Sequence, residues 1–402
     1  MIQSENPVKP IHPVHPVQTL FLFLFFRALS RFSRTLLLFF CSSVVSMAIG
    51  SLFAAEPDPK VAELRREVAP CGWIVFSAHP AELDKGVLIG NRGARGQLDL
   101  YLARPDGSEL RNLTKSDELH EFGVRFSADG KKILYRRCPK GEAVGHDHWG
   151  EQGELVVANA DGSNPVSLGK NREFPWATWS PDLKQIACLY RKEGLIRIHD
   201  VETKQIVQEM PSQGIYQQLV WSPDGKRLVG TANVSGQMWN IVSYDLATRK
   251  TTLLSRFLNC TPDWFQSDPS RVIYSNRIPG ITTRLDEASN RDGFTILMQA
   301  TADGKQRTLV YGRLRKHVYF GCTSPDGKYA IFADDPADGL IVGEMHLVRM
   351  ADTPIVAPQP EFPELKEKYP EAKDGPVLDL TLPNGTPLRG FEPHWTAAPI
   401  GR

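Results

Sequence analysis

The sequence predicts an all-β fold: a six-bladed β-propeller of four-stranded blades, closed by the C-terminal strand, which joins the first blade. Two observations predict this fold. A phrase of the form Ser-Pro-Asp-Gly recurs at long and fairly regular intervals, and a short apolar run lies on each side of every copy. Glycine (32 residues) and proline (30 residues) are plentiful, which favours strands and turns over long helices.

The recurring phrase has the chemistry of a hairpin turn. Proline presets its φ to about −65°, aspartate hydrogen-bonds to nearby backbone, and glycine adopts the left-handed conformation that returns the chain. Leu183 takes the glycine position of one copy, so a residue with a side chain must adopt that conformation there. Ser267 marks a degraded fifth copy. The four clear copies are FSADGKK (126–132), WSPDLKQ (179–185), WSPDGKR (221–227) and TSPDGKY (323–329).

A second turn phrase follows each first phrase, as in RPDGSELRNLT (104–114) and NADGSNPVSLG (159–169). The two turns divide each unit into four strands. Four-stranded units that repeat every ~40–50 residues are typical of β-propellers. The predicted blades span 73–114 with 390–396, 120–169, 173–210, 214–255, 259–310 and 316–358.

The domain organisation follows from these spans. The propeller covers 73–396, and within it 359–389 is a proline-rich excursion with a strand of its own, VLDLTL. The first unit has no inner strand, whereas GFEPHWT (390–396) has the pattern of one, so the C-terminus is expected to complete that blade. Residues 56–72 form a short linker that fits one helix.

Residues 1–55 have the pattern of a signal peptide, because arginines precede an apolar run that ends in small residues near Ala54 and Ala55. The apolar run is about 20 residues long, enough to span a bilayer, so an uncleaved N-terminal anchor is the alternative. We expect a periplasmic or secreted protein that contacts a membrane only if this segment is retained.

Charge and cysteine content argue against nucleic-acid binding and against a complete set of internal disulfides. The formal net charge of +1 provides no basic surface for a nucleic acid. One of the six cysteines, Cys41, lies in the N-terminal segment, and the odd number that remains cannot all pair internally. Cys188 and Cys322 lie in apolar strand patterns, which favours buried free thiols, although one disulfide stays open.

The turn phrases resemble the WD40-like PD40 repeats of the TolB-like six-bladed propellers, over about 73–350 and the C-terminal strand. The resemblance implies a periplasmic propeller that binds an envelope protein or lipoprotein. TolB-like proteins carry an α/β domain before the propeller, but only the linker 56–72 stands there in this sequence. The same blade occurs in oligogalacturonate lyases, which hold a histidine-bound metal, so the resemblance also raises an enzyme.

Candidate site residues gather on one predicted face, where long loops (78–97, 138–153 and 277–293) and the starts of the inner strands meet. Histidines and carboxylates from separate blades are ligands that Zn²⁺ or Mn²⁺ accepts, and His120, His317 and His394 are the candidate ligands. In the simpler alternative these histidines cap strands or line a wet channel. The predicted binding residues are His120, Glu121, His146, His148, Trp149, Glu173, Asp263, His317, Glu392 and His394.

Two functions from different classes are compatible with these patterns. We predict an exported propeller that binds a protein of the cell envelope, has no chemistry of its own and needs no cofactor. The alternative is a metal-dependent carbohydrate-active enzyme that acts on a uronic-acid polysaccharide. Convergence of the histidines on one pocket would favour the enzyme. Tryptophans on the inner strands are expected to pack between blades; they are Trp176, Trp179, Trp221, Trp264 and Trp395.

Overall fold

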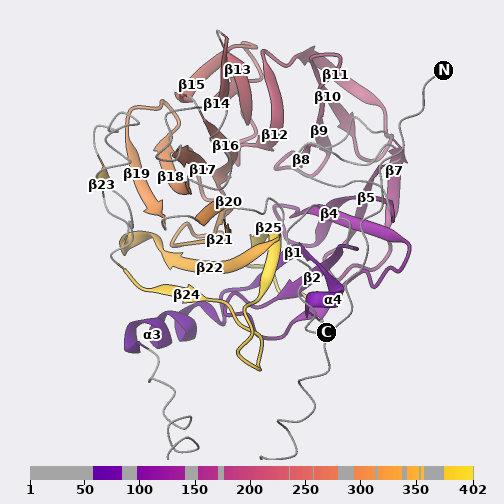
Figure 1. Cartoon of the computed structure of the whole chain (residues 1–402). Coiled ribbons are helices and arrows are strands. Elements are labelled where there is room, and N and C mark those ends of the chain that lie inside the picture. Colours follow the sequence, from indigo (N-terminus) through magenta and orange to yellow (C-terminus); the bar gives the residue numbers. More distant parts are fainter. Residues whose placement is uncertain are drawn as a thin grey trace, which may run out of the picture. The chain divides into compact units, whose positions relative to one another are not determined.

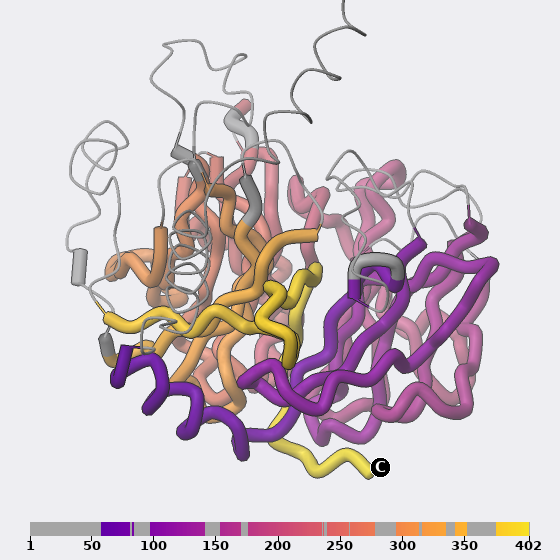
Figure 2. Tube along the Cα trace, turned by 60° about the horizontal axis from the view of Figure 1, so that its bottom comes forward, coloured from indigo at the N-terminus to yellow at the C-terminus, as the bar shows by residue number. Residues whose placement is uncertain are grey.

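The computed structural model describes residues 58–83, 97–140, 153–170, 176–234, 236–256, 258–278, 294–312, 316–336, 342–352, 355–356 and 375–401. From Pro59 onward the described residues lie in one compact unit, Pro59–Arg402, built mainly from antiparallel strands (Figures 1 and 2). Within these residues, no helix has both the length and the apolar composition that crossing a membrane requires.

Three separate sheets have four strands each, and each sheet is an antiparallel meander in chain order. The first contains β4 (Leu119–Phe126), β5 (Lys132–Pro139), β6 (Glu154–Asn159) and β7 (Val166–Lys170). The second contains β8 (Ala177–Trp179), β9 (Gln185–Tyr190), β10 (Leu195–Asp200) and β11 (Ile206–Pro211). The third contains β12 (Ile215–Trp221), β13 (Arg227–Val234), β14 (Gln237–Asp245) and β15 (Thr251–Ser255).

The remaining strands form three further groups that are linked by a few pairs into one 13-stranded sheet. One group is β16 (Asn259–Phe265), β17 (Asp268–Ile278), β18 (Phe294–Thr301) and β19 (Arg307–Tyr311). The next is β20 (Lys316–Thr323), β21 (Tyr329–Pro336), β22 (Gly343–Arg349) and β24 (Val377–Asp379). The last is β25 (Arg389–Thr396), β1 (Trp73–Ala78), β2 (Asp99–Ala103) and β3 (Arg111–Asn112).

The C-terminal strand β25 pairs with β1 near the start of the described chain, as the sequence predicts (Figure 1). Ile74 lies opposite Trp395 in this antiparallel pair. The Trp395 side chain is fully buried, and its indole Nε1 donates a hydrogen bond to the carbonyl oxygen of Cys71 at 2.7 Å. The two ends of the described chain therefore stabilise the same sheet.

The outer edge of the β20–β22 group differs from the prediction. The sequence pattern placed the end of this unit at 358, but its fourth strand is β24, which comes from VLDLTL and pairs with β22. A short strand inside the predicted span, β23 (Ile355–Val356), pairs instead with β19 of the preceding group. Two-residue pairing of this kind has no sequence signature, because an outer edge accepts any short extended segment.

Hydrogen bonds within the four turn phrases confirm the predicted turns. In all four copies the serine hydroxyl donates to the aspartate two residues later at 2.6–2.7 Å, and it accepts the N–H of the residue five positions later at 2.9–3.0 Å. The glycines of three copies have φ between 66° and 74°. Leu183 has φ of 63°, so it adopts the left-handed conformation without the freedom of glycine.

A short helix precedes the first strand, within the predicted linker. Helix α3 (Pro59–Val68) buries Leu64 and Val68 against the sheet at the strands around β1 and β22. Its Glu67 carboxylate accepts two hydrogen bonds from Arg349 on β22, both at 2.8 Å. A second short helix, α4 (Pro80–Leu83), follows β1. Apolar burial and the ion pair between Glu67 and Arg349 together hold α3 on the sheets.

The predicted packing of inner-strand tryptophans between blades is confirmed for Trp264, and the predicted buried free thiols are confirmed for Cys188 and Cys322. Trp264 is buried, and its indole donates to the carbonyl oxygen of Val220 on the neighbouring sheet at 3.2 Å. Packing across sheets is therefore one role of an inner-strand tryptophan. The five described cysteines are all free thiols; they are Cys71, Cys138, Cys188, Cys260 and Cys322.

Candidate functional site

The inner strands of five strand groups share one irregularity. In each of β4, β12, β16, β20 and β25 the register shifts against the paired strand, which marks a bulge. A bulge places two residues opposite one and bends the strand, so it changes the direction of the side chains that follow. One residue with positive φ lies at each bulge: Gly123, Gln218, Thr261, Phe320 and Glu392.

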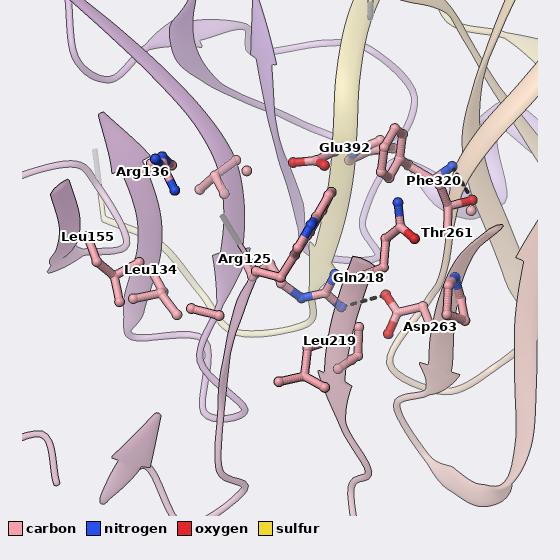
Figure 3. A pocket seen from close by; sticks show the side chains of 18 residues that line it. Arg125, Leu134, Arg136, Leu155, Gln218, Leu219, Thr261, Asp263, Phe320 and Glu392 are labelled. Carbon is pink, nitrogen blue, oxygen red and sulfur yellow. Dashed lines mark hydrogen bonds and ion pairs between the residues drawn. The ribbon is translucent and has the colours of Figure 1, made fainter. Parts of the chain in front are cut away.

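The bulges surround one open cavity, whose empty space is about 670 Å³ with the solvent at its mouth included (Figure 3). All five bulge residues line it, and Trp176 and Ala177 line it at the start of β8. Inner strands from all six strand groups therefore contribute to its wall. We call this cavity the channel. Apolar side chains make up much of its wall: Leu134, Leu155, Leu219, Val220 and Phe320.

An ion pair crosses the channel. Arg125 on β4 donates from Nη2 to Oδ2 of Asp263 on β16, at 2.5 Å (Figure 3). Burial alone would lower the pKa of Arg125, but the charge of Asp263 outweighs it and raises that pKa. Burial raises the pKa of Asp263, against the charge and hydrogen bond of Arg125. The pair connects two strand groups that are far apart in the sequence.

Two further titratable groups of β25 lie near this pair. Burial raises the pKa of the Glu392 carboxyl to about 8, and the positive charge of Arg125 opposes the rise only in part. Burial and then Arg125 lower the pKa of His394 well below its usual value. At neutral pH the channel therefore contains a protonated Glu392 and a neutral His394.

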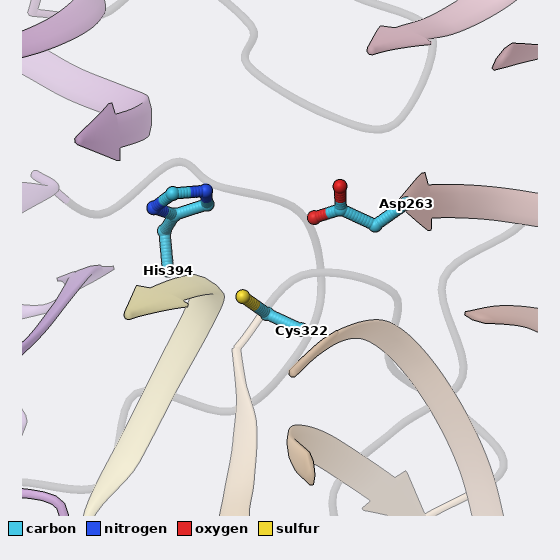
Figure 4. Close-up of side chains that lie close together, drawn as sticks. All are labelled: Asp263, Cys322 and His394. Atoms are coloured by element: carbon cyan, nitrogen blue, oxygen red, sulfur yellow. The ribbon is translucent and has the colours of Figure 1, made fainter. Parts of the chain in front are cut away.

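Asp263, Cys322 and His394, which we call the channel group, converge from three strands (Figure 4). One possible ligand atom from each lies within 4.8 Å of the others. However, Nδ1 of His394 accepts the backbone N–H of Phe126 at 3.2 Å. A neutral imidazole carries one proton, so that proton is on Nε2, and a protonated nitrogen cannot bind a metal.

The other two members are also unsuited to a cation. Asp263 already pairs with the Arg125 guanidinium, which would repel a divalent ion. Burial, followed by the charge of Asp263, raises the pKa of the Cys322 thiol to about 12, whereas a metal binds the thiolate. The channel group as it lies does not fit a divalent metal.

Comparisons with known proteins show which proteins this chain is similar to. No family model matches the chain. The Tol-Pal system protein TolB of Alcanivorax borkumensis is 32% identical over 142 residues, which are 33% of this chain and 31% of that protein. The chain thus spans about a third of this curated relative. The crystal structure of TolB from Acinetobacter baumannii has a TM-score of 0.53 at 15% identity, over 80% of this chain and 66% of that one.

The chain has the fold of a TolB-like β-propeller. A second solved structure, an oligogalacturonate lyase in complex with manganese, gives a TM-score of 0.37 at 15% identity over 57% of this chain and 63% of that one. A score this low supports no conclusion about the channel. The TolB-like propeller fold matches the resemblance that the repeated turn phrases predict.

Two predicted site residues, His120 and Glu121, lie at the start of β4 away from the channel group. The backbone N–H of Leu98 donates to Nδ1 of His120 at 3.2 Å. Burial, helped by His79 and Lys140, lowers the pKa of His120 to about 4. Burial, helped by the charge of Asp99, raises the pKa of Glu121 to about 8. Both residues belong to the contact between β4 and β2 of this propeller.

The third histidine, His317, has its own partners on β18 and β20. Its Nδ1 lies 2.8 Å from Oγ1 of Thr295, and its ring stacks on Tyr319 with centroids 6.1 Å apart. Among the described residues, neither His317 nor His120 belongs to a group of three metal-binding side chains, whereas His394 does. The structure thus gives the three candidate ligands separate partners and does not gather them around one ion.

Four predicted site residues lie outside the described part of the chain, and their predicted roles stay predictions: His146, His148, Trp149 and Glu173. Of the described candidates, the channel contains Asp263 and Glu392 in its wall and His394 beside them.

Sequence reasoning missed several channel residues, among them Arg125, Gln218 and Phe320. The repeat contains a signal that could have identified these residues, namely their distance from the serine of the turn phrase. Arg125 stands two residues before the serine of its turn phrase, where Cys322 also stands. Gln218 and Phe320 stand four residues before their serines, as Gly123 does. Aligning the copies on that serine would have identified both rows of channel residues.

Proposed function

We propose that the chain is an exported TolB-like β-propeller whose six four-stranded blades close into a ring through β25. In this proposal it binds a protein or lipoprotein of the cell envelope and performs no chemistry. The pairing of β25 with β1 and a single cavity lined by inner strands from all six groups support the closed ring. The relative named as a Tol-Pal system protein supports an envelope partner.

One observation supports binding over catalysis most directly: the reactive groups in the channel are held in inactive states. The Cys322 thiol is protonated because burial raises its pKa to about 12. Asp263 is engaged by Arg125, and Nδ1 of His394 is occupied by a backbone N–H. A nucleophilic thiol is activated by a lowered pKa or an adjacent base, whereas the surroundings of Cys322 raise its pKa.

The test is titration of the purified full chain with the purified Pal lipoprotein encoded by the same genome. Phe320→Asp, in the channel wall, is expected to weaken binding about tenfold or more. Ile206→Asp is the matched control, because Ile206 is 50% exposed on β11 and does not line the channel. Equal loss in both variants, or no binding to Pal, would contradict this partner.

Export is tested separately by N-terminal sequencing of the protein recovered from the periplasm of an expressing cell. A new N-terminus near residue 55 is expected from the predicted signal peptide. Recovery of the intact N-terminus in the membrane fraction would favour the anchored alternative.

A metal-dependent carbohydrate-active enzyme is the second candidate, and the proximity of Asp263, Cys322 and His394 is the observation that favours it. The hydrogen bond that occupies Nδ1 of the neutral His394 and the position of Arg125 beside Asp263 weigh against it. Zinc or manganese content of the purified full chain decides between the two. A stoichiometric metal that disappears in His394→Ala, together with cleavage of polygalacturonate, would replace the binding proposal.

A further inference from the structure

The edge strand β11 exposes two neighbouring apolar side chains. Ile206 is 50% exposed and Val207 is 52% exposed. Among the described residues, one other large apolar side chain is as exposed, Val166 on the edge strand β7 of the preceding sheet. β11 is the last strand of its sheet, and no described strand pairs with its outer side. An exposed apolar edge is a template for another strand, so the β11 edge is a candidate docking surface.

A bulge turns the backbone at these two residues toward the open side. Val207 is the extra residue of this bulge, because its two neighbours on β11 each have a partner on β10 and it has none there. Gln205 faces β10, since its carbonyl oxygen accepts the N–H of Asp200. Backbone groups alternate along a strand, so those of Ile206 face away from β10. Ile206 and Val207 are thus both available to a strand on the open side.

Another edge strand of this fold shows that an edge with a bulge accepts a strand. β19 is the outer strand of its group, and its register against β18 also shifts at a bulge. Bulges often protect an edge from pairing, yet β23 pairs with the outer side of β19. The residues that pair there are Ile355 and Val356, the same dipeptide that β11 exposes. The bulge of β11 is therefore no obstacle to pairing.

The β11 segment is complementary to a second copy of itself. In an antiparallel pair with a two-fold axis at this dipeptide, Ile206 of each copy lies opposite Val207 of the other. The same register brings Lys204 of each copy to the level of Glu209 of the other. Opposite charges at facing positions stabilise a strand pair. A shift of two residues would place Ile206 opposite Glu209 and separate both matched pairs, so the charges favour this register.

Both charged side chains have hydrogen-bonding capacity left for this contact. Lys204 is exposed at the end of the turn before β11, and its Nζ lies 3.4 Å from the carbonyl oxygen of Ser167. An ammonium has three N–H groups, so this long contact leaves two for another acceptor. The Glu209 side chain is 49% exposed, and its Oε2 accepts a hydrogen bond from Nε of Arg197 at 2.7 Å. A carboxylate has two oxygens, so Oε1 remains for a lysine.

We propose that two copies of the chain associate through antiparallel pairing of their β11 edges, with Ile206 and Val207 at the centre and an ion pair between Lys204 and Glu209 at each end. One short strand from each copy buries less than the ~1,600 Å² of a standard interface. The dimer is therefore reversible, with a dissociation constant of about 10–100 μM. This inference is independent of the proposed function, because β11 contributes no residue to the channel wall.

Sedimentation equilibrium of the full chain from about 5 to 500 μM measures the association. The wild type is expected to be mostly monomeric at the lowest concentration and mostly dimeric at the highest. Ile206→Asp places a carboxylate twice at the centre of the interface, so it should weaken the dimer about tenfold or more. A monomer throughout would overturn the proposal. So would a dimer that Ile206→Asp leaves unchanged, as association through the apolar N-terminal run would be.

Charge reversal tests the register. Lys204→Glu gives facing acids at both ends of the pair, and Glu209→Lys gives facing bases. Each variant alone should therefore dimerise about tenfold more weakly than the wild type. A mixture of the two variants should associate with the affinity of the wild type, because every facing pair then combines opposite charges. No gain on mixing would overturn the pairing of Lys204 with Glu209.

Glu193→Lys is the matched control for Glu209→Lys. Glu193 pairs with the same Arg197 and is similarly exposed at 45%, but it lies in the turn before β10 and outside β11. This variant should dimerise as the wild type does, and equal weakening in both variants would overturn the role of Glu209. If Ile206→Asp fails to fold by circular dichroism, Val207→Lys replaces it, and the same loss of the dimer is expected.

Discussion

Two clusters of the molecule each combine a buried aspartate with a buried histidine, and they differ in how their members are paired. The channel group is Asp263, Cys322 and His394. The other, which we call the β22 group, is Asp334, Glu344 and His346. The channel group has one ion pair, from Asp263 to Arg125, and a histidine whose Nδ1 accepts a backbone N–H.

In the β22 group, in contrast, every member has an oppositely charged or ionisable partner: Lys316 for Asp334 and Glu344, and Asp379 for His346. Asp334 is fully buried and accepts hydrogen bonds from Tyr311 and Lys316, both at 3.0 Å. His346 lies 3.1 Å from Asp334 through Nε2 and 2.7 Å from Asp379 through Nδ1. Burial alone would raise the pKa of Asp334, but His346 and Lys316 lower it to about 2. A lysine already supplies a cation to this group, and His346 connects it to Asp379 on β24.

The comparison teaches that burial of an acid and a histidine does not by itself indicate a site. Complete pairing, as in the β22 group, indicates a structural role. A single ion pair beside an open cavity, as in the channel group, leaves room for a ligand. Four predictions test this distinction, from the largest expected effect to the smallest.

The largest effect is expected from Asp334→Ala. It removes the shared acceptor of Tyr311, Lys316 and His346 and leaves buried donors unpaired. The free energy of unfolding should fall by about 3–5 kcal/mol, measured by urea denaturation. Asp303→Ala is the control, since Asp303 is exposed in a turn, and it should change the midpoint little. Similar midpoints for the two variants would show that the β22 group is not structural.

Glu392→Gln is expected to stabilise the protein at high pH. The folded pKa of Glu392 is raised to about 8 from 4.5, so the folded state keeps a proton that the unfolded state has lost. This carboxyl therefore lowers stability progressively as pH rises from about 4.5 to about 8. The variant should gain about 3–4 kcal/mol at pH 8 and nothing near pH 4. A gain that does not depend on pH would contradict the buried neutral carboxyl.

The ion pair of the channel is tested by a double-mutant cycle. Asp263→Leu alone leaves the Arg125 charge in the channel and should cost about 2–3 kcal/mol of unfolding free energy. The double variant Arg125→Met/Asp263→Leu should lie within about 1 kcal/mol of the wild type. Additive losses would show that the two charges do not interact as the structure has them.

The smallest effect is expected at His346 and His394, whose contributions to the free energy of unfolding change with pH in opposite directions. Burial alone would lower the pKa of His346, but hydrogen bonds to Asp334 and Asp379 raise it. Its contribution is complete below about pH 6.5 and is lost as pH rises through the raised pKa. His346→Gln should therefore cost about 1 kcal/mol more at pH 6 than at pH 9.

The contribution of His394 to stability changes with pH in the opposite direction, because burial and Arg125 lower its pKa in the folded state. Its neutral form is favoured in the folded state, so it reduces stability as pH falls below about 6.5. His394→Gln should gain stability at pH 5 relative to pH 8. Unfolding free energies at these values are the measurement, and equal signs for His346 and His394 would remove the contrast between the two groups.

Much of the fold was predictable because the repeated turns depend on residues close in the chain. The serine and aspartate of each phrase bond within five residues, so their pattern is visible in the sequence. The strand β24 was not predictable as a sheet edge, because its pairing with β22 joins segments whose order along the chain gives no register.

The sequence by itself determined the four-stranded repeat, the turn conformations and the partner of β25, since periodic apolar strands and local hydrogen bonds are written in short stretches. Only the tertiary structure decided which polar residues meet in the channel. Arg125 and Asp263 are 138 residues apart, and a bulge in each strand contributes to bringing them within 2.5 Å. The charge states of Glu392 and His394 were decided there too, because burial and a distant arginine set both pKa values.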